Sequence, residues 1–131
     1  MTLRTTQYKL VQMSPATHTG KYTLVDFWFT HCPACIAQFP KLKQCYALHH
    51  INGFEIVAIS TDGKNNFQRW QKMVSDEGMG WKHYLDLNGV HAQELSITTF
   101  PTNYLLDERG IVLKRNITPT ELETFLVERG L

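Results

Sequence analysis

Two nearly continuous apolar runs dominate the hydrophobic pattern. Residues 22 to 29 read YTLVDFWF and residues 54 to 60 read FEIVAIS, and both runs are rich in aromatic and β-branched side chains. Such runs are typical of strands buried on both faces of a sheet. About two dozen residues separate them, which is enough for a helical crossover between parallel strands. The pattern therefore predicts a βαβ unit, and its connection is expected to be right-handed.

The crossover itself has a helical pattern. From Pro33 onward, apolar or weakly polar positions recur every three or four residues, which places them on one face of a helix. These positions are Ile36, Phe39, Leu42, Tyr46 and His49. We therefore predict that a helix starts at Pro33 and packs on the sheet.

The second half predicts two further strands between helices. Apolar spacing from Phe67 to Val74 indicates a helix that ends near EGMG, and a shorter helix is expected near residues 88 to 95. The segment WKHYLDL between them is poorly defined. TNYLLD and IVLKR flank Gly110 and predict an antiparallel hairpin, because glycine can adopt a positive φ in the connection.

The chain is expected to close with a helix. Thr118, Pro119 and Glu121 form a capping-box pattern with proline at the first helical position, and apolar Leu122 and Phe125 follow. The fold class is thus α/β, with a βαβ half followed by a ββα half around one mixed sheet flanked by helices.

Composition narrows the possible functions. The 131 residues, 43% of them hydrophobic, suit one domain spanning residues 1–131. Thirteen basic against twelve acidic residues give a net charge of +1 without a basic run, which argues against nucleic-acid and anionic-membrane partners. The start, MTLRTTQYKLVQ, lacks the apolar core of a signal peptide, although a removed signal or anchor would leave the same pattern.

Two cysteines stand where the first strand meets the helix. Unpaired backbone N–H groups and the helix dipole favour a thiolate at a helix N-terminus, so Cys32 is the candidate nucleophile, with an exposed thiol. Cys35 lies one turn further along, where it could attack a mixed disulfide formed on Cys32. The alternatives are structural cysteines or half of a zinc site. A zinc site usually needs a second CxxC or a paired histidine motif, which the sequence lacks, so we expect no metal.

The third cysteine is expected to lie apart from this pair. Ten helical residues between Cys35 and Cys45 correspond to roughly 15 Å of rise, whereas disulfide Cα separations reach only about 7 Å. Cys45 is therefore most simply a buried core thiol.

Asp26 is the polar exception within the first apolar run. Burial disfavours a charged carboxylate and raises its pKa, so Asp26 could exchange protons with Cys35 near neutral pH. A purely structural, hydrogen-bonded aspartate is the alternative.

Together these motifs resemble the thioredoxin superfamily, and within it the TlpA/ResA-type thiol-disulfide oxidoreductases. The resemblance covers about residues 20 to 130 and rests on LVDFW before the CxxC, Pro40 inside the helix, FEIVAIS and FPTNYLLDERGIV. It implies a thioredoxin-like fold, Cys32 as the attacking and Cys35 as the resolving thiol, and no cofactor. It also implies that Asp26 corresponds to the buried acid of thioredoxins.

The resemblance further implies a substrate-binding groove. Pro101 would be cis beside the cysteines, and Phe100 would border the substrate's extended chain. Trp28 and His31, which flank the approach to Cys32, are counted with these substrate-binding residues. His31 replaces the tryptophan common in thioredoxins, and Pro33-Ala34 replaces Gly-Pro. A cationic His31 would stabilise the Cys32 thiolate and make the couple more oxidising, whereas a solvated histidine would have no such role.

Three functions compete at this stage. The leading hypothesis is a thiol-disulfide oxidoreductase that acts on protein dithiols or disulfides. A peroxiredoxin-like peroxidase is an alternative, but Thr30 stands only two residues before Cys32 and the expected upstream proline is missing. A Cu(I)-handling module is the third, although relatives that deliver copper typically have three residues between their cysteines.

The expected partners are a protein thiol or disulfide substrate and an upstream redox partner. We expect a monomer without membrane contact through this segment. From the resemblance we expect a bacterial periplasm or cell envelope location, with the cytoplasm as the alternative.

Overall fold

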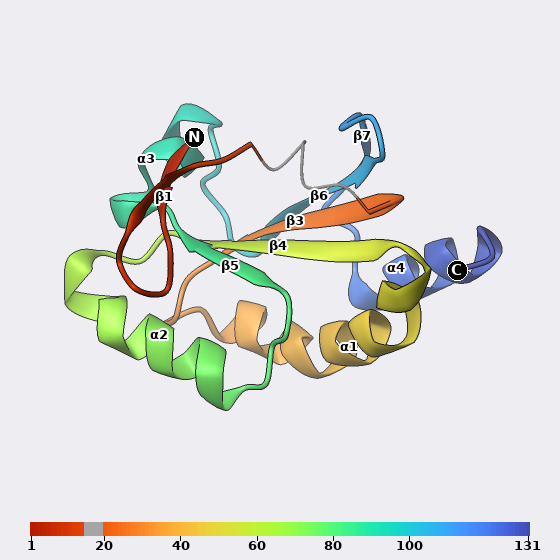
Figure 1. Ribbon diagram of the computed structural model, residues 1–131, viewed down its shortest axis with the longest axis horizontal. Helices are drawn as coiled ribbons and strands as arrows, with labels where there is room; N and C mark the ends of the chain where they lie inside the picture. Colours follow the sequence, from red (N-terminus) through yellow and green to blue (C-terminus); the bar gives the residue numbers. More distant parts are fainter. Residues whose placement is uncertain (15–19) are drawn as a thin grey trace.

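Strands from both halves of the chain join one mixed sheet. The computed structural model describes residues 1–14 and 20–131 (Figure 1), and seven described strands lie in the order β2-β1-β5-β4-β3-β6-β7. In chain order they are β1 (Thr2–Arg4), β2 (Leu10–Gln12), β3 (Tyr22–Trp28), β4 (Phe54–Ser60), β5 (Lys82–Leu85), β6 (Thr102–Asp107) and β7 (Val112–Arg115).

The helices divide between the two faces of this sheet. They are α1 (Pro33–His49), α2 (Phe67–Asp76), α3 (Val90–Glu94) and α4 (Pro119–Glu128), with short 3-10 turns η2 (His50–Asn52), η3 (Lys64–Asn66) and η4 (Leu87–Gly89). Side chains from α1, α2 and α4 share one hydrophobic core with the sheet, while α3 contributes to a second core on the opposite face. In Figure 1, α1 and α2 lie below the strands and α3 lies above them.

The central strands confirm the predicted βαβ unit. β3 pairs in parallel with β4 from Tyr22↔Phe54 to Trp28↔Ser60, and α1 makes the crossover. On its other edge β3 pairs antiparallel with β6, which in turn pairs with β7. β3 is therefore interior to the sheet and covered on both faces, which explains why its sequence is a continuous apolar run rather than an alternation.

Three strands were not predicted. β5 lies within WKHYLDL, the segment left undefined by the pattern, and pairs in parallel with β4 over four residues. The hairpin of β1 and β2 then extends the sheet through one bridge, Arg4↔Leu85. These strands are short and partly exposed, so they carry too few apolar positions to show a period.

The closing helix begins as predicted. The Thr118 hydroxyl accepts a hydrogen bond from the Glu121 N–H at 3.1 Å, and a Glu121 carboxylate oxygen accepts one from the Thr118 N–H at 2.9 Å. This reciprocal box satisfies two N–H groups that the first helical turn would leave unpaired. It fixes where α4 starts and so which of its residues face α1.

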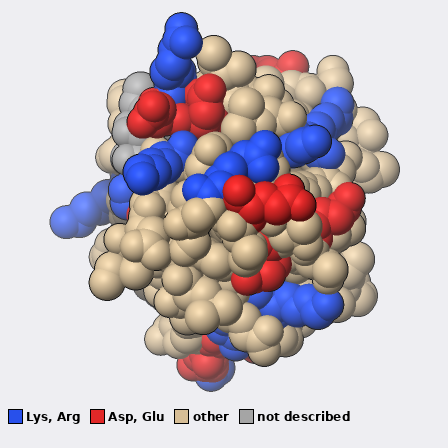
Figure 2. All heavy atoms as spheres, turned by 90° about the vertical axis from the view of Figure 1, so that its right-hand side faces the viewer, with Lys and Arg blue, Asp and Glu red and all other residues tan. Residues whose placement is uncertain are grey.

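Charge is mixed over the end of the molecule that carries α4. Figure 2 shows this face, the right-hand side of Figure 1, with basic and acidic side chains interspersed. The view agrees with the near-balanced charge of the sequence.

Candidate active site

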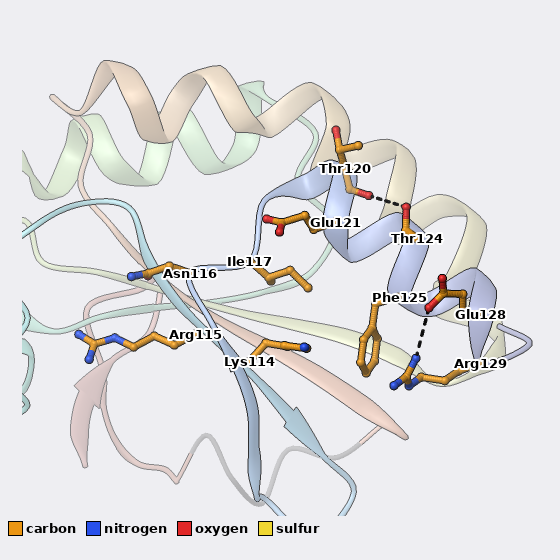
Figure 3. Close-up of a pocket in the computed structure, with 10 residues that line it drawn as sticks. All are labelled: Lys114, Arg115, Asn116, Ile117, Thr120, Glu121, Thr124, Phe125, Glu128 and Arg129. Carbon is orange, nitrogen blue, oxygen red and sulfur yellow. Dashed lines mark hydrogen bonds and ion pairs between the residues drawn. The ribbon is translucent and has the colours of Figure 1, made fainter.

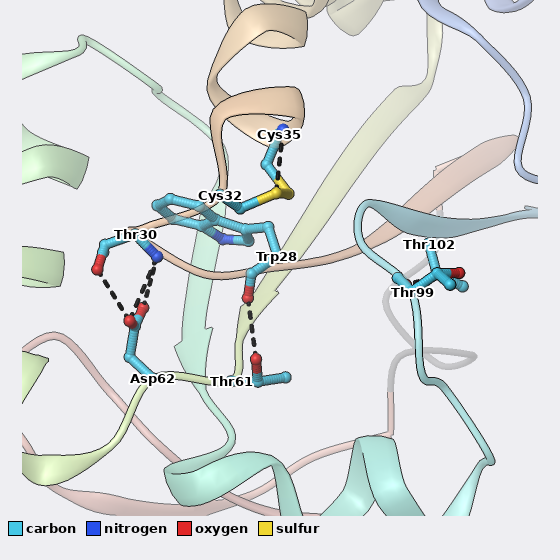
Figure 4. The surroundings of a disulfide bond; sticks show 8 residues. All are labelled: Trp28, Thr30, Cys32, Cys35, Thr61, Asp62, Thr99 and Thr102. Carbon is cyan, nitrogen blue, oxygen red and sulfur yellow. Dashed lines mark hydrogen bonds between the residues drawn. A yellow bond between two sulfur atoms is a disulfide. The ribbon is translucent and has the colours of Figure 1, made fainter.

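The two cysteines of the CxxC motif form a disulfide at the N-terminus of α1. Cys32 is the N-cap residue, and its Cα lies 5.3 Å from that of Cys35. The Cys32 Sγ also accepts a hydrogen bond from the Cys35 N–H at 3.2 Å (Figure 4). Pro33 occupies the first helical turn, where its missing N–H costs nothing. The backbone thus directs the Cys35 N–H and the positive end of the helix dipole at the sulfur expected to become the thiolate.

The disulfide is less accessible than expected. Cys32 is 5% exposed and Cys35 is 2% exposed, whereas His31, Pro33 and Ala34 are exposed. The expectation of an exposed Cys32 thiol was wrong for the oxidised form, because its sulfur turns inward to bond Cys35 and packs in the core shared with α1. The exposed residues around Cys32 form the surface through which a partner would reach it.

A buried carboxylate anchors the loop that leads to Cys32. Asp62 accepts hydrogen bonds from the Thr30 N–H at 3.1 and 3.2 Å and from the Thr30 hydroxyl at 2.8 Å. The Ser60 hydroxyl also bonds the Asp62 carboxylate. All three residues are at most 4% exposed. This network ties the end of β4 to the loop after β3, as Figure 4 shows.

This anchor was not predicted from the sequence. Asp62 lies 32 residues from Thr30, so no local period connects them. The available signal was weak: Ser60 ends a buried parallel strand and Asp62 stands two residues later, where the carboxyl end of β4 lies beside that of β3. Such strand ends commonly hold functional side chains in α/β sheets.

Asp26 is buried in the centre of β3. It is 4% exposed, and its Oδ1 has no hydrogen-bond partner among the described residues. Desolvation by burial raises the pKa of Asp26 from 3.8 to about 7. Because side chains alternate along a strand, Asp26 shares the sheet face of Leu24 and Trp28, the face that α1 covers. With this pKa, Asp26 is partly protonated and partly ionised near neutral pH.

The predicted cis bond is confirmed. The Phe100–Pro101 peptide is cis, and both residues are half-buried. The Phe100 ring packs edge-on against Phe29 at 5.4 Å between centroids, and the Phe29 carbonyl accepts a hydrogen bond from the Cys32 N–H at 3.2 Å. The loop before β6 thus contacts the loop that carries Cys32. Thr99 and Thr102, on either side of this bond, belong to the surroundings of the disulfide drawn in Figure 4.

The other two proposed substrate residues differ in position. His31 is exposed beside Cys32. Trp28 is only 1% exposed and packs edge-on against Phe39 of α1, with ring centroids 5.1 Å apart. A direct substrate contact by Trp28 stays a prediction, and it would require neighbouring side chains to move. In the oxidised structure Trp28 supports the first turns of α1.

Cys45 is a buried free thiol, as predicted. It is 2% exposed and lies on α1 with Phe39 and Leu42 on the core side of the helix. Burial, together with the charge and hydrogen bond of Glu123, raises the pKa of Cys45 to about 12. This thiol is therefore protonated where the CxxC is expected to work.

A separate groove of about 410 Å3 lies between β7 and α4 (Figure 3). Its lining mixes polar and apolar side chains: Arg129 lies 3.9 Å from Glu128 and stacks 3.6 Å above the Phe125 ring. It shares no residue with the surroundings of the disulfide drawn in Figure 4. We therefore assign it no part in the thiol chemistry.

Among the described residues, no helix has both the length and the apolar character needed to cross a bilayer.

Comparison with known proteins adds independent information on the site. The family model described as Redoxin matches residues 2–126. Sporulation thiol-disulfide oxidoreductase A of Bacillus subtilis is 28% identical over 105 residues, which cover 79% of this chain and 64% of that protein. Thiol-disulfide oxidoreductase ResA of Halalkalibacterium halodurans is 29% identical over 97 residues, covering 72% of this chain and 53% of that protein. The chain thus spans about half to two thirds of the length of these relatives.

Solved structures are similar over nearly the whole chain. The solution structure of a thiol:disulfide interchange protein from Bacteroides sp. is 27% identical with a TM-score of 0.79, covering 98% of this chain and 84% of that one. The thioredoxin domain of a thiol-disulfide oxidoreductase from Bacteroides vulgatus is also 27% identical, with a TM-score of 0.80, and covers 99% of this chain and 91% of that one. With its CxxC disulfide and thioredoxin-like sheet, the chain belongs to the Redoxin family and is a TlpA/ResA-like member of the thioredoxin superfamily.

Proposed function

We propose that this chain is a thiol-disulfide oxidoreductase that exchanges electrons with protein dithiols and disulfides. The observation that carries the proposal is the Cys32–Cys35 disulfide at the N-terminus of α1, in a chain of the Redoxin family. The names of the relatives support the same chemistry.

In the reducing direction the reaction begins with the dithiol form. The Cys32 thiolate attacks one sulfur of a substrate disulfide, which forms a mixed disulfide and releases the other substrate sulfur as a thiolate. The helix N-terminus favours this thiolate over the thiol, because the helix dipole and the Cys35 N–H, which bonds the sulfur, stabilise negative charge there. At this point the Cys32 sulfur has been oxidised to the disulfide level and the released substrate sulfur has been reduced to a thiolate.

The second step resolves the mixed disulfide. Cys35 loses its proton and attacks the Cys32 sulfur, so that the Cys32–Cys35 bond forms and the second substrate thiolate leaves. Two electrons have then passed from the CxxC to the substrate. Asp26 is the proposed acceptor of the Cys35 proton, since a pKa of about 7 lets it take and return a proton at working pH. In the oxidising direction the same steps run in reverse.

Substrate would bind across the exposed rim of the disulfide. His31 is exposed beside Cys32, and the half-buried Phe100 and Pro101 approach the same loop through Phe29. An extended substrate segment lying along Phe100 and Pro101 would bring its sulfur to Cys32. An upstream redox protein would use the same surface to restore the resting state, and we propose that the chain acts as a monomer in the bacterial cell envelope.

Insulin-disulfide reduction provides the direct test. The wild-type chain should catalyse the reaction with dithiothreitol as reductant, and Cys32→Ser should abolish catalysis. Cys35→Ser should instead accumulate a mixed disulfide on Cys32, visible as an adduct by mass spectrometry. Cys45→Ser is the matched control and should keep wild-type activity. Activity that survives Cys32→Ser would refute the assignment.

The competing functions give different outcomes in parallel assays. Consumption of hydrogen peroxide at a rate exceeding insulin reduction would favour a peroxidase. Stoichiometric Cu(I) binding without insulin reduction would favour a copper-handling module. The reduction potential then sets the direction: a value near roughly −270 mV indicates a reductase and one near about −120 mV indicates an oxidant.

A further inference from the structure

A second group of reactive side chains lies at the other end of α1. Cys45 and His49 are four residues apart on this helix, so they lie on one face, one turn apart. Glu123 comes from α4, which packs against α1. Within the described part of the chain, one group of three possible metal ligands is found, and it consists of these residues. Its Cys Sγ, His nitrogen and Glu oxygen all lie within 4.8 Å of one another.

We propose that Cys45, His49 and Glu123 form a zinc-binding site between α1 and α4. The ligand types are those that Zn²⁺ takes in proteins, and three protein ligands with water in the fourth position are a common zinc coordination. Neither the proposed redox function nor the family resemblance assigns a metal to these residues. The site is independent of the CxxC, which is closed as a disulfide.

The geometry needs only a small contraction. Zinc lies about 2.3 Å from sulfur and about 2.0–2.2 Å from nitrogen and oxygen, so tetrahedral ligand atoms are about 3.3–3.6 Å apart. The His49 Nε2 and Glu123 Oε2 are 2.8 Å apart and would separate slightly. The largest separation in the group would shrink by about 1.2 Å from 4.8 Å. The Glu123 side chain can supply this adjustment, because it is 38% exposed.

Charge and hydrogen bonding also fit a divalent cation. A thiolate and a carboxylate together balance the two positive charges of zinc, so the buried site with neutral imidazole would carry no net charge. The His49 side chain is 6% exposed, and its Nδ1 has no hydrogen-bond partner among the described residues. In the metal-free protein the Glu123 carboxylate accepts the Nε2 proton at 2.8 Å. Zinc would take the place of that proton, and the unpartnered Nδ1 could then carry the ring proton while Nε2 binds the metal.

A path from solvent leads to the ligands. A groove of about 340 Å3 between α1 and α4 is lined by both Cys45 and Glu123, with Gln44, Thr120 and Thr124 among its polar walls. Lys41 on the same groove donates a hydrogen bond to the Thr120 hydroxyl at 2.8 Å. The groove brings solvent to the residues that carry the sulfur and the carboxylate, and the buried His49 lies within hydrogen-bond distance of Glu123.

The sequence could not indicate this site. Cys45 and His49 follow no common zinc motif, and Glu123 is 74 residues from His49. The motif rule that argued against zinc concerns ligands close together in sequence, whereas here the third ligand arrives only when α4 docks on α1.

The test uses the oxidised full chain, in which Cys45 is the remaining free thiol of three cysteines. Isothermal titration with zinc should give one equivalent bound. Cobalt(II) should give a thiolate-to-cobalt charge-transfer band and the visible bands of tetrahedral coordination, and both should disappear when zinc is added. Absence of zinc binding to the oxidised wild type at millimolar metal, or cobalt bound without a charge-transfer band, would overturn the proposal.

Variants identify the ligands. Cys45→Ser should remove the charge-transfer band, and His49→Gln and Glu123→Gln should each weaken zinc binding by at least about tenfold. The matched control is His91→Gln, because His91 pairs with Glu94 at 3.4 Å on a surface helix without a thiol. Unchanged zinc affinity in Cys45→Ser would refute the site. If a variant fails to fold, the cobalt spectrum of the wild type still decides the question.

Discussion

The two ends of α1 place cysteine in opposite environments. At the N-terminus, the Cys32 sulfur accepts a hydrogen bond from the Cys35 N–H, and the first turn contains no acidic residue. Near the C-terminus, Cys45 lies beside the Glu123 carboxylate, and burial with this negative charge raises its pKa to about 12. One helix thus carries at its N-terminus the Cys32 sulfur, where the helix dipole favours a thiolate, and further along a third thiol whose surroundings oppose ionisation.

The difference shows that the position of a cysteine relative to helix ends and carboxylates decides what its thiol can do. Burial alone does not separate the two sites, since Cys32, Cys35 and Cys45 are all at most 5% exposed. What differs is the sign of the nearest partial or full charge. The same negative environment that keeps Cys45 protonated would attract a metal cation.

The largest expected effect is the difference in alkylation between the two ends. At pH 7 an ordinary thiol is a few per cent thiolate, whereas one with a pKa of about 12 is ionised in only about one molecule in 10⁵. In the reduced protein, iodoacetamide should therefore label Cys32 at least about 10³-fold faster than Cys45. Peptide mass spectrometry over time measures both rates. Faster labelling of Cys45 would reverse the assignment of the nucleophile.

Asp26→Asn should change how stability depends on pH. Burial raises the pKa of Asp26 from 3.8 to about 7, so the native state binds this proton more tightly than the unfolded chain. The wild type therefore loses stability as pH rises from about 4 to 7, by up to roughly 4 kcal/mol, and stays at the lower level above pH 7. Because the variant cannot ionise, its unfolding free energy, measured by urea unfolding, should rise relative to that of the wild type between pH 4 and pH 8. A difference in unfolding free energy that is independent of pH would contradict the raised pKa.

The same variant should slow resolution of the mixed disulfide near neutral pH, measured by quenched-flow trapping.

Asp62→Asn tests the anchor beneath the CxxC. The substitution replaces a charged acceptor of the Thr30 hydrogen bonds by a neutral one, and it places the side-chain NH2 of asparagine against the Thr30 donors. The unfolding free energy should therefore fall by about 2–3 kcal/mol. Alkylation of reduced Cys32 should also become faster as its loop loosens. Asp107→Asn is the control, because the partly exposed Asp107 carboxylate accepts hydrogen bonds from backbone N–H groups in a surface turn. Its unfolding free energy should change by less than about 1 kcal/mol. Equal losses of unfolding free energy in the two variants would contradict the proposal that Asp62 anchors the loop before Cys32.

Glu123→Gln should give the smallest effect, and it tests what keeps Cys45, near the C-terminus of α1, less reactive than Cys32. Removing the carboxylate charge should lower the pKa of Cys45, but burial, the larger cause, remains. We expect metal-free Cys45 labelling to rise by up to about tenfold, a pKa change of about one unit, and to stay well below that of Cys32. Glu128→Gln on the same helix should leave the rate unchanged. A Cys45 rate equal to that of Cys32 would mean that the carboxylate alone separates the two sites.

Local pattern determined much of this molecule. The apolar runs of β3 and β4, the helical stripe of α1 and the capping box of α4 each follow from a few neighbouring residues, and the structure confirms all of them. The CxxC at the start of α1 was equally clear, because strand, proline and cysteines are contiguous. Resemblance added the cis bond before Pro101, which local physics alone makes improbable.

Only the tertiary structure decided which distant groups meet. The strand β5 forms because it can pair with the edge of β4, and the β1–β2 hairpin then pairs with β5 through β1. Asp62 reaches Thr30 because parallel β3 and β4 end side by side, and Glu123 reaches His49 because α4 packs on α1. These contacts bridge 32 and 74 residues, and hydrophobic periodicity carries no information on which polar side chains will face each other across such distances.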